Sequence, residues 1–195
     1  METIKAELQA AGLNLSSITV QRLAAYASEL DHWNKAVNLS ALRGSALWKR
    51  LIIEPIRIGT FLKMRGVLAD IGSGNGSPGI PLCLACELHE VHLIEPRLKR
   101  ASFLRHVVAK LGLKNVIVHR KRIEEFPDEA MTCDWIALQA IEPTRVMLNS
   151  LKRISSTTTR VVWITSKTTP PVESAARLDL PDMSDCGWIF QLDQT

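Results

Sequence analysis

The sequence predicts an α/β fold with a mostly parallel sheet and helices on both faces. From residue 67 onward, short apolar runs alternate with longer amphipathic segments, which is typical of βαβ units. A glycine-rich stretch, LADIGSGNGSPGIPL at 68–82, begins in the first of these runs and leads into a helix. Residues 1–65 carry apolar positions at helical spacing. We therefore expect a single domain, with an N-terminal helical cap over 1–65 and a core over 66–195.

The individual elements follow in order along the chain. Ser16 or Ser17 can cap a helix whose apolar residues recur at three, four or seven positions. A second apolar segment at 47–58 contains Pro55, which should end or kink a helix there. The strands of the core are predicted at 67–71, 91–95, 116–119, 135–140, 160–165 and 188–192. Helices are expected from the glycine stretch to about Cys86, at 97–111 and near 144–151.

The composition is that of an ordinary soluble globular protein, with 46% hydrophobic and 23% charged residues in a chain of 195. No apolar stretch is long enough to span a bilayer, and the first residues lack the pattern of a signal peptide, so we expect a cytoplasmic location and no membrane partner. Cys83 and Cys86 form a single C-x-x-C without further ligands at zinc spacing. We therefore expect two buried thiols on one helix face and no metal site.

Positive charge is clustered along the chain. The formal net charge is only +4, but residues 97–122 hold nine Lys or Arg and no Asp or Glu. Such clustering is the footprint expected of a protein that binds a polyanion such as nucleic acid. A solvated helix face whose acids lie elsewhere in the fold would produce the same pattern. Charge alone leaves both interpretations open.

The glycine stretch predicts a ligand-binding turn beyond the carboxyl end of the first core strand. Its segment GNGSPG at 74–79 satisfies the dinucleotide pattern G-x-G-x-x-G, and Glu95 ends the second strand where a ribose-binding acid is expected. The same region also fits D-x-G-x-G, with Asp70, Gly72 and Gly74 placed as in enzymes that bind S-adenosylmethionine. Asp70 and Gly72 favour the methyl donor. An NAD-dependent oxidoreductase is the alternative that this pattern leaves.

Four stretches taken together resemble one family. They are WNKAVNLSALR (33–43), LADIGSGNGSPGIPL (68–82), LIEPRLKRASFLRHVVAKLGLKNVIVHRKRIEEF (93–126) and CDWIALQA (133–140). In this order and at these distances they resemble the bacterial 16S ribosomal RNA guanine-N7 methyltransferases, also called the glucose-inhibited division protein B family. The resemblance implies a Rossmann-like class I methyltransferase fold and S-adenosylmethionine as the methyl donor. It implies a guanine in the decoding region of 16S ribosomal RNA as the methyl acceptor.

The resemblance also assigns roles to residues of this chain. Gly72 and Ser77 match loop positions that line the cofactor, Glu95 matches the ribose position, and Ile123 and Glu124 match the loop that borders the adenine. The full set expected at the cofactor is Asp70, Gly72, Ser73, Gly74, Gly76, Ser77, Glu95, Ile123, Glu124 and Gln139. Contacts with RNA are expected from Arg97, Lys99, Arg100 and Arg122. The implied partner is 16S ribosomal RNA or the small ribosomal subunit, and we expect the protein to act as a monomer.

The chain departs from the family's pattern near the expected site. It reads LQA at 138–140 where the family has Ser-Arg-Ala, so Gln139 replaces an arginine at the candidate catalytic position. Arg50 is kept, but Glu54 and Pro55 stand among residues that differ from the family after it. These changes motivate a second hypothesis, a degenerate member that binds RNA or cofactor with little turnover. Guanine N7 is already a lone-pair acceptor, so the lack of an evident general base is no objection to catalysis.

Overall fold

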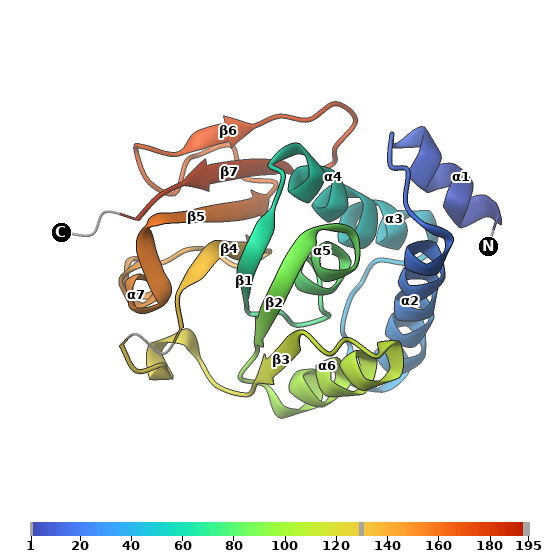
Figure 1. Ribbon diagram of the computed structural model, residues 1–195, viewed down its shortest axis with the longest axis horizontal. Helices are drawn as coiled ribbons and strands as arrows, with labels where there is room; N and C mark the ends of the chain where they lie inside the picture. The colour runs from blue at the N-terminus through green and yellow to red at the C-terminus, as the bar shows by residue number, and fades with distance from the viewer. Residues whose placement is uncertain (1, 129–130, 193–195) are drawn as a thin grey trace.

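The computed structural model, which describes residues 2–128 and 131–192, contains a seven-stranded sheet with helices on both sides (Figure 1). The strands are β1 (Arg65–Ile71), β2 (Glu87–Ile94), β3 (Val116–His119), β4 (Cys133–Gln139), β5 (Ser155–Thr165), β6 (Ala176–Leu178) and β7 (Cys186–Phe190). They lie in the order β3-β2-β1-β4-β5-β7-β6. Strands β1 to β5 are parallel, whereas β7 is antiparallel to both β5 and β6. The mostly parallel α/β architecture expected from the sequence is therefore confirmed.

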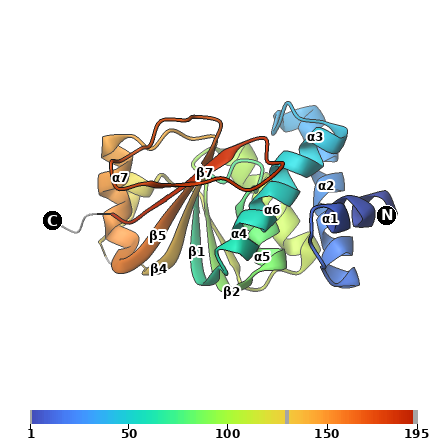
Figure 2. The same ribbon diagram turned by 90° about the horizontal axis from the view of Figure 1, so that it is seen from above.

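The helices form an N-terminal group and the crossovers of the sheet. The first group is α1 (Glu2–Ala10), α2 (Ser17–Val37), α3 (Gly44–Trp48), the π-helical turn η1 (Lys49–Ile53) and α4 (Glu54–Phe61). The crossovers contain α5 (Gly79–Ala85), α6 (Leu98–Leu111), the 3₁₀ turns η2 (Ile123–Glu125) and η3 (Lys152–Ile154), and α7 (Arg145–Leu151). Figure 2 shows α4, α5 and α6 on one face of the sheet and α7 on the other. Over the described ranges, no helix combines the length and apolarity needed to cross a membrane.

Two apolar clusters lie on the two faces of the sheet. Because successive strand residues point to opposite faces, β1 contributes to both clusters. Leu68 belongs to the cluster that contains the core of α2, α5 and α6, whereas Ala69 and Ile71 belong to the cluster that contains Leu151 of α7. All four side chains are essentially buried. This two-sided burial explains why the central strands read as nearly continuous apolar runs in the sequence.

Among the N-terminal helices, α2 packs against the core of the fold through helix α6. Ser16 caps α2 as expected, because its hydroxyl accepts a hydrogen bond from the Thr19 N–H at 3.2 Å. Farther along α2, the Trp33 ring packs edge-on against Phe103 of α6, with 5.8 Å between the ring centroids. The buried carboxylate of Glu29 accepts a hydrogen bond from the Lys110 ammonium at 2.5 Å. Helix α2 therefore covers α6, which borders the carboxyl edge of the sheet.

Pro55 does not end the helical segment in which it lies. Elements α3, η1 and α4 follow one another without a break from Gly44 to Phe61. The Glu54 N–H donates to the carbonyl of Lys49, five residues earlier, so the backbone is in π-helical register just before the proline. Pro55 then falls in the first turn of α4, where a missing N–H is tolerated. The proline is accommodated by a π-helical turn, so of the two expected outcomes, a helix end or a kink, the helix end does not occur.

Candidate active site

A cavity of about 660 Å³ opens at the carboxyl ends of β1, β2 and β4. The order of the sheet reverses between β1 and β4, and open α/β sheets bind their ligands at such a switch point. The walls come from residues 39–40, 50–51, 71–75, 94–97, 122–124 and 139–141, with single contributions from Leu42, Ser77, Arg100, Met147 and Asp185. A cavity of this volume is in the range that holds a cofactor or a small ligand.

The glycine loop forms the floor of the cavity. The N–H groups of Gly72 and Ser73 both donate to the carbonyl of Ile94, at 2.7 and 3.1 Å, which ties the loop to the end of β2. Gly72 has φ +69°, and a Cβ built on it would lie 1.8 Å from Cδ1 of Ile141. Glycine is therefore required here by the backbone conformation and by the close approach of the chain's own Ile141.

Asp70 shapes the loop from beneath. Its side chain is 1% exposed, and Oδ2 accepts a hydrogen bond from the Gly79 N–H at 3.1 Å. Its carbonyl accepts a hydrogen bond from the Ser73 hydroxyl at 2.8 Å. Burial raises the pKa of Asp70 to about 7. Of the residues in this region that we expected at the cofactor, Asp70 and Gly76 do not line the cavity. The other four do line it, namely Gly72, Ser73, Gly74 and Ser77.

Glu95 presents a fixed carboxylate to the cavity. The residue follows β2, is 3% exposed and lines the cavity wall. Its Oε2 accepts a hydrogen bond from the Gly74 N–H at 3.1 Å, and its Oε1 accepts one from the Arg97 N–H at 2.8 Å. These two backbone donors hold the carboxylate in one orientation. An acid at this point of an α/β sheet is suited to accept hydrogen bonds from ribose hydroxyls.

An apolar surface lies beside this carboxylate. Ile71, Ile94 and Ile123 all line the cavity and are at most 3% exposed. Glu124 follows Ile123 in η2, and its carbonyl accepts a hydrogen bond from Nη1 of Arg153 at 3.0 Å. The expected adenine-side residues, Ile123 and Glu124, are therefore brought to the same cavity as Glu95. The isoleucine side chains offer a flat apolar contact for an aromatic ring.

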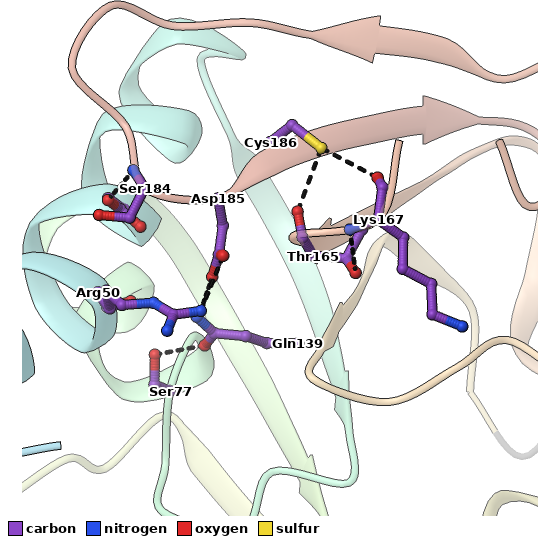
Figure 3. A network of polar contacts seen from close by, with 9 residues as sticks. Arg50, Ser77, Gln139, Thr165, Lys167, Ser184, Asp185 and Cys186 are labelled. Carbon is purple, nitrogen blue, oxygen red and sulfur yellow. Dashed lines mark hydrogen bonds and ion pairs between the residues drawn. The ribbon is translucent and has the colours of Figure 1, made fainter. Parts of the chain in front are cut away.

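A polar network closes the opposite side of the cavity (Figure 3). Nη2 of Arg50 donates to both carboxylate oxygens of Asp185, at 2.8 and 2.6 Å, and this pairing raises the pKa of Arg50. Oε1 of Gln139 accepts a hydrogen bond from the Ser77 hydroxyl at 2.6 Å, and Nε2 of Gln139 donates to the Arg50 carbonyl at 3.2 Å. Gln139 therefore lies at the cavity as expected, with both ends of its amide engaged by protein groups.

Asp185 is a site residue that sequence reasoning missed. It lies just before β7 and is 135 residues from the arginine that it binds. The neighbouring Ser184 N–H donates to the buried carboxylate of Glu54 at 2.5 Å, so two adjacent residues of this segment hold the N-terminal helices. No spacing pattern links positions so far apart. Only the placement of β7 beside β5 brings them together.

A second missed wall segment is the loop after α2. The Asn34 amide donates to the carbonyl of Ser40 at 2.7 Å, and its Oδ1 accepts hydrogen bonds from the N–H groups of Leu39 and Ser40 at 2.6 and 3.0 Å. Leu39, Ser40 and Leu42 then line the cavity. The sequence signal for this contact is the asparagine in the stretch WNKAVNLS. Asn34 lies five residues before Leu39, and its side-chain amide can hydrogen-bond to the backbone of the loop.

The basic cluster of residues 97–122 divides between the cavity and packing roles. Arg97, Arg100 and Arg122 line the cavity, whereas Lys99 is exposed on α6 and does not. Other members hold the fold together, since Lys110 binds Glu29 and the Lys121 ammonium lies 4.0 Å from the centre of the Phe126 ring. Three arginines therefore form what we call the basic rim, namely Arg97, Arg100 and Arg122.

Other chemistry-bearing groups lie apart from the cavity. Cys83 and Cys86 are half-buried thiols at the end of α5, and burial raises the pKa of Cys86 to about 11. Both pack against the larger apolar cluster, which matches the expectation of structural thiols. Within residues 2–128 and 131–192, no group of three or more His, Cys, Asp or Glu side chains is arranged to hold a metal ion.

Comparison with known proteins places this chain in a family. The model of the family described as GidB, rRNA small subunit methyltransferase G, matches residues 19–174. The chain belongs to this family. A GidB relative from Xylella fastidiosa (strain 9a5c), named ribosomal RNA small subunit methyltransferase G, is 40% identical over 131 residues, which cover 67% of this chain and 61% of the relative. A relative of the same name from Wolinella succinogenes is 32% identical over 163 residues, which cover 84% of this chain and 83% of the relative.

The fold of this GidB chain is similar to that of solved methyltransferase structures. The crystal structure of an RNA methyltransferase from Salinibacter ruber in complex with S-adenosyl-L-homocysteine matches with a TM-score of 0.57 and 17% identity. The match covers 73% of this chain and 92% of that one. The Rossmann-like methyltransferase fold expected from the sequence is thereby confirmed. Neither the family nor this structural likeness supports the nicotinamide-dependent oxidoreductase. The chain spans about three fifths of the length of the Xylella relative.

Proposed function

We propose that this GidB chain transfers a methyl group from S-adenosylmethionine to N7 of a guanine in 16S ribosomal RNA within the small ribosomal subunit. One observation carries the proposal. The cavity at the carboxyl ends of β1 and β2 brings the glycine loop and the fixed carboxylate of Glu95 into the same space as the basic rim. The names of the Xylella and Wolinella relatives support ribosomal RNA of the small subunit as the substrate.

The cavity residues fit the proposed cofactor. The Glu95 carboxylate is placed to accept ribose hydroxyls, and the buried isoleucines beside it suit an adenine ring. Gly74 has φ +46°, a left-handed conformation that favours glycine, and its N–H is thereby directed at Oε2 of Glu95. When bound, S-adenosylmethionine would supply an electrophilic methyl group on a sulfonium ion. The residues themselves would bind and orient it.

The proposed reaction requires this chain to position the two reactants and does not require it to transfer a proton. Guanine N7 presents a lone pair at the edge of the base and can attack a methyl group without prior deprotonation. Holding two reactants in line can contribute about 7–11 kcal/mol in favourable cases. The basic rim would hold the phosphates of the RNA, while the glycine loop and Glu95 would hold the methyl donor. Residues of the cavity wall between them would then set the alignment.

The cofactor assignment is tested by ligand-dependent thermal stability. S-adenosylmethionine and S-adenosyl-L-homocysteine should raise the melting temperature of this chain, because a ligand stabilises the fold that it binds. Glu95→Gln should shrink the rise, whereas Glu87→Gln, at the exposed start of β2, should leave it unchanged. Protection by NAD without protection by S-adenosylmethionine would contradict the proposal.

The RNA assignment is tested by the salt dependence of binding. Each phosphate contact that is removed should reduce the slope of log K against log salt by about 1. The double variant Arg97→Ala, Arg100→Ala should therefore bind 16S RNA more weakly and with a shallower slope. Arg65→Ala is the matched control, because this exposed arginine begins β1 at the opposite end of the sheet. An unchanged slope of log K against log salt in the double variant would show that Arg97 and Arg100 of the basic rim do not contact RNA phosphates.

A further inference from the structure

Gln139 joins two segments that are far apart in the chain. Its Oε1 accepts a hydrogen bond from Ser77 of the glycine loop at 2.6 Å, and its Nε2 donates to the Arg50 carbonyl in η1 at 3.2 Å. Figure 3 shows the glutamine joined to Ser77 and beside the Arg50 side chain. The distinct donor and acceptor of the amide suit the two partners, since a hydroxyl can donate and a carbonyl can only accept. A single side chain thus ties the cofactor loop to the N-terminal helices.

The Arg50 carbonyl is open to Gln139 because of the neighbouring Pro55. In an α-helical register, this carbonyl would accept from the Glu54 N–H, but that group donates to Lys49 instead. In a π-helical register, it would accept from residue 55, and proline has no N–H. Neither usual backbone donor therefore reaches the Arg50 carbonyl. The π-helical turn and the proline together create the acceptor that the Gln139 side chain uses.

The other end of Arg50 is held as well. Its Nη2 donates to both oxygens of the buried Asp185 carboxylate at 2.8 and 2.6 Å. Arg50, Gln139, Ser77 and Asp185 all line the cavity. The carbonyl and the guanidinium of Arg50 are thus fixed from two directions. A single guanidinium nitrogen shared between both carboxylate oxygens anchors this end of the side chain.

We propose that Gln139 is a positioning residue, which acts by holding Ser77 of the cofactor loop and Arg50 of the acceptor-side wall in one arrangement. This inference rests on the proposed methyl transfer and adds the role of one residue to it. The Ser77 half of the bridge orients the loop that holds the methyl donor. The Arg50 half fixes the position of η1, whose residues Arg50 and Leu51 line the cavity in which the proposed reaction would align the guanine. Gln139 therefore couples cofactor binding to acceptor alignment, and it touches neither reacting atom.

Two substitutions separate the halves of the bridge. Gln139→Leu removes both hydrogen bonds and should weaken S-adenosylmethionine binding and raise the KM for small subunits, each by about 3- to 30-fold. Gln139→Glu keeps an acceptor for Ser77 but has no donor for the Arg50 carbonyl. It should raise the KM for small subunits while leaving cofactor affinity within about 3-fold of the parent. Gln191→Leu is the control, because Gln191 also donates to a backbone carbonyl, that of Thr157, away from the cavity.

Pro55→Ala provides the decisive cross-test. In the parent chain, the new N–H competes with Gln139 for the Arg50 carbonyl, so the KM for small subunits should rise. In the Gln139→Leu background there is no bridge left to disturb, so Pro55→Ala should leave the KM within about 3-fold of the Gln139→Leu value. A rise in the parent background alone would establish that Gln139 acts through this carbonyl. Equal effects in both backgrounds, or parental behaviour of Gln139→Leu, would overturn the inference.

Hydrogen exchange separates this inference from the proposed function. Gln139→Leu should speed amide exchange in both 49–53 and 72–78, whether or not a cofactor is added, and Gln191→Leu should change neither segment. Unchanged exchange in both segments would overturn the bridge even in an active enzyme. A parent chain that neither binds S-adenosylmethionine nor transfers methyl groups would instead overturn the proposed function. The exchange result would then still decide whether Gln139 joins the two segments.

Discussion

Two buried carboxylates at the ends of neighbouring strands have different roles. Asp70 of β1 is turned beneath the glycine loop and holds the Gly79 N–H, while Glu95 after β2 faces the cavity. Both are at most 3% exposed. Glu95 accepts hydrogen bonds on both oxygens, but Oδ1 of Asp70 has no hydrogen-bond partner among the residues that the structure describes. Burial without full hydrogen bonding disfavours the charged form of Asp70, which is why its pKa is raised.

Asp70→Asn should change how stability depends on pH. The folded pKa of about 7 lies above the ordinary value of 3.8, so the folded state binds this proton more tightly than the unfolded state. The free energy of unfolding of the parent chain should therefore fall as pH rises from about 4 to about 7, and then level off. The asparagine keeps an acceptor for Gly79 and carries no charge. We expect it to be more stable than the parent at pH 8 by about 2–4 kcal/mol.

Urea unfolding of both chains at pH 5 and pH 8 checks this prediction. His119 contributes the opposite trend, because burial lowers its pKa to about 4 and stability then rises with pH up to the ordinary value of 6.5. That contribution is common to both chains and cancels in their difference. A difference in stability that does not change between the two pH values would contradict the account of Asp70.

Gly66 should be intolerant of a side chain. It has φ +93° at a register shift of β1, and a Cβ there would lie 2.0 Å from Oδ2 of Asp134, which accepts the Val67 N–H at 2.8 Å. Gly66→Ala should cost about 2–4 kcal/mol of unfolding free energy. Gly112→Ala is the control, since Gly112 also has positive φ but nothing within 4 Å of its Cβ position. It should cost only about 1–2 kcal/mol. Chemical denaturation giving equal losses would refute the steric argument.

At the scale of elements, the loop after α2 depends on one asparagine. Asn34→Ala removes three hydrogen bonds and leaves the N–H groups of Leu39 and Ser40 without their acceptor. We expect the free energy of unfolding to fall by about 1–3 kcal/mol and amide hydrogen exchange over residues 38–42 to become faster. Asn34→Asp keeps the acceptor oxygen and should show the smaller change. Because this loop lines the cavity, Asn34→Ala should also weaken ligand binding, and unaltered exchange at 38–42 would count against this role.

Element boundaries show where sequence reasoning succeeds. Apolar runs located β3 at 116–119 without error, because three of its four residues are β-branched and apolar, although the strand lies at the edge of the sheet and only Val116 is buried. Strand β5 begins five residues earlier than predicted, since its first residues, SSTTT, are polar and carry no apolar signal. The three-residue strand β6, Ala176–Leu178, was not predicted because it is too short and too exposed to show an alternating pattern. Pro55 was expected to end or kink a helix, because residue preferences cannot anticipate a change of helical register.

At the scale of the whole molecule, the candidate site divides into predictable and unpredictable halves. The glycine loop, Glu95, Ile123 and the basic rim follow strand ends in sequence order, and the parallel sheet brings such ends to one edge. The other half consists of long-range pairs, above all Arg50 with Asp185. Nothing in local spacing encodes such a pair. It depends on the return of the chain through β7, which inserts beside β5.

The proposed function requires that this cavity carries out methyl transfer to ribosomal RNA. This requirement is tested by the transfer of a labelled methyl group from S-adenosylmethionine to 16S RNA in small subunits that lack the modification, followed by identification of the labelled base. We expect label on guanine N7, with Glu95→Gln reducing the rate and Glu87→Gln leaving it unchanged. A folded chain that transfers no label, or that labels another position, would overturn the proposed function.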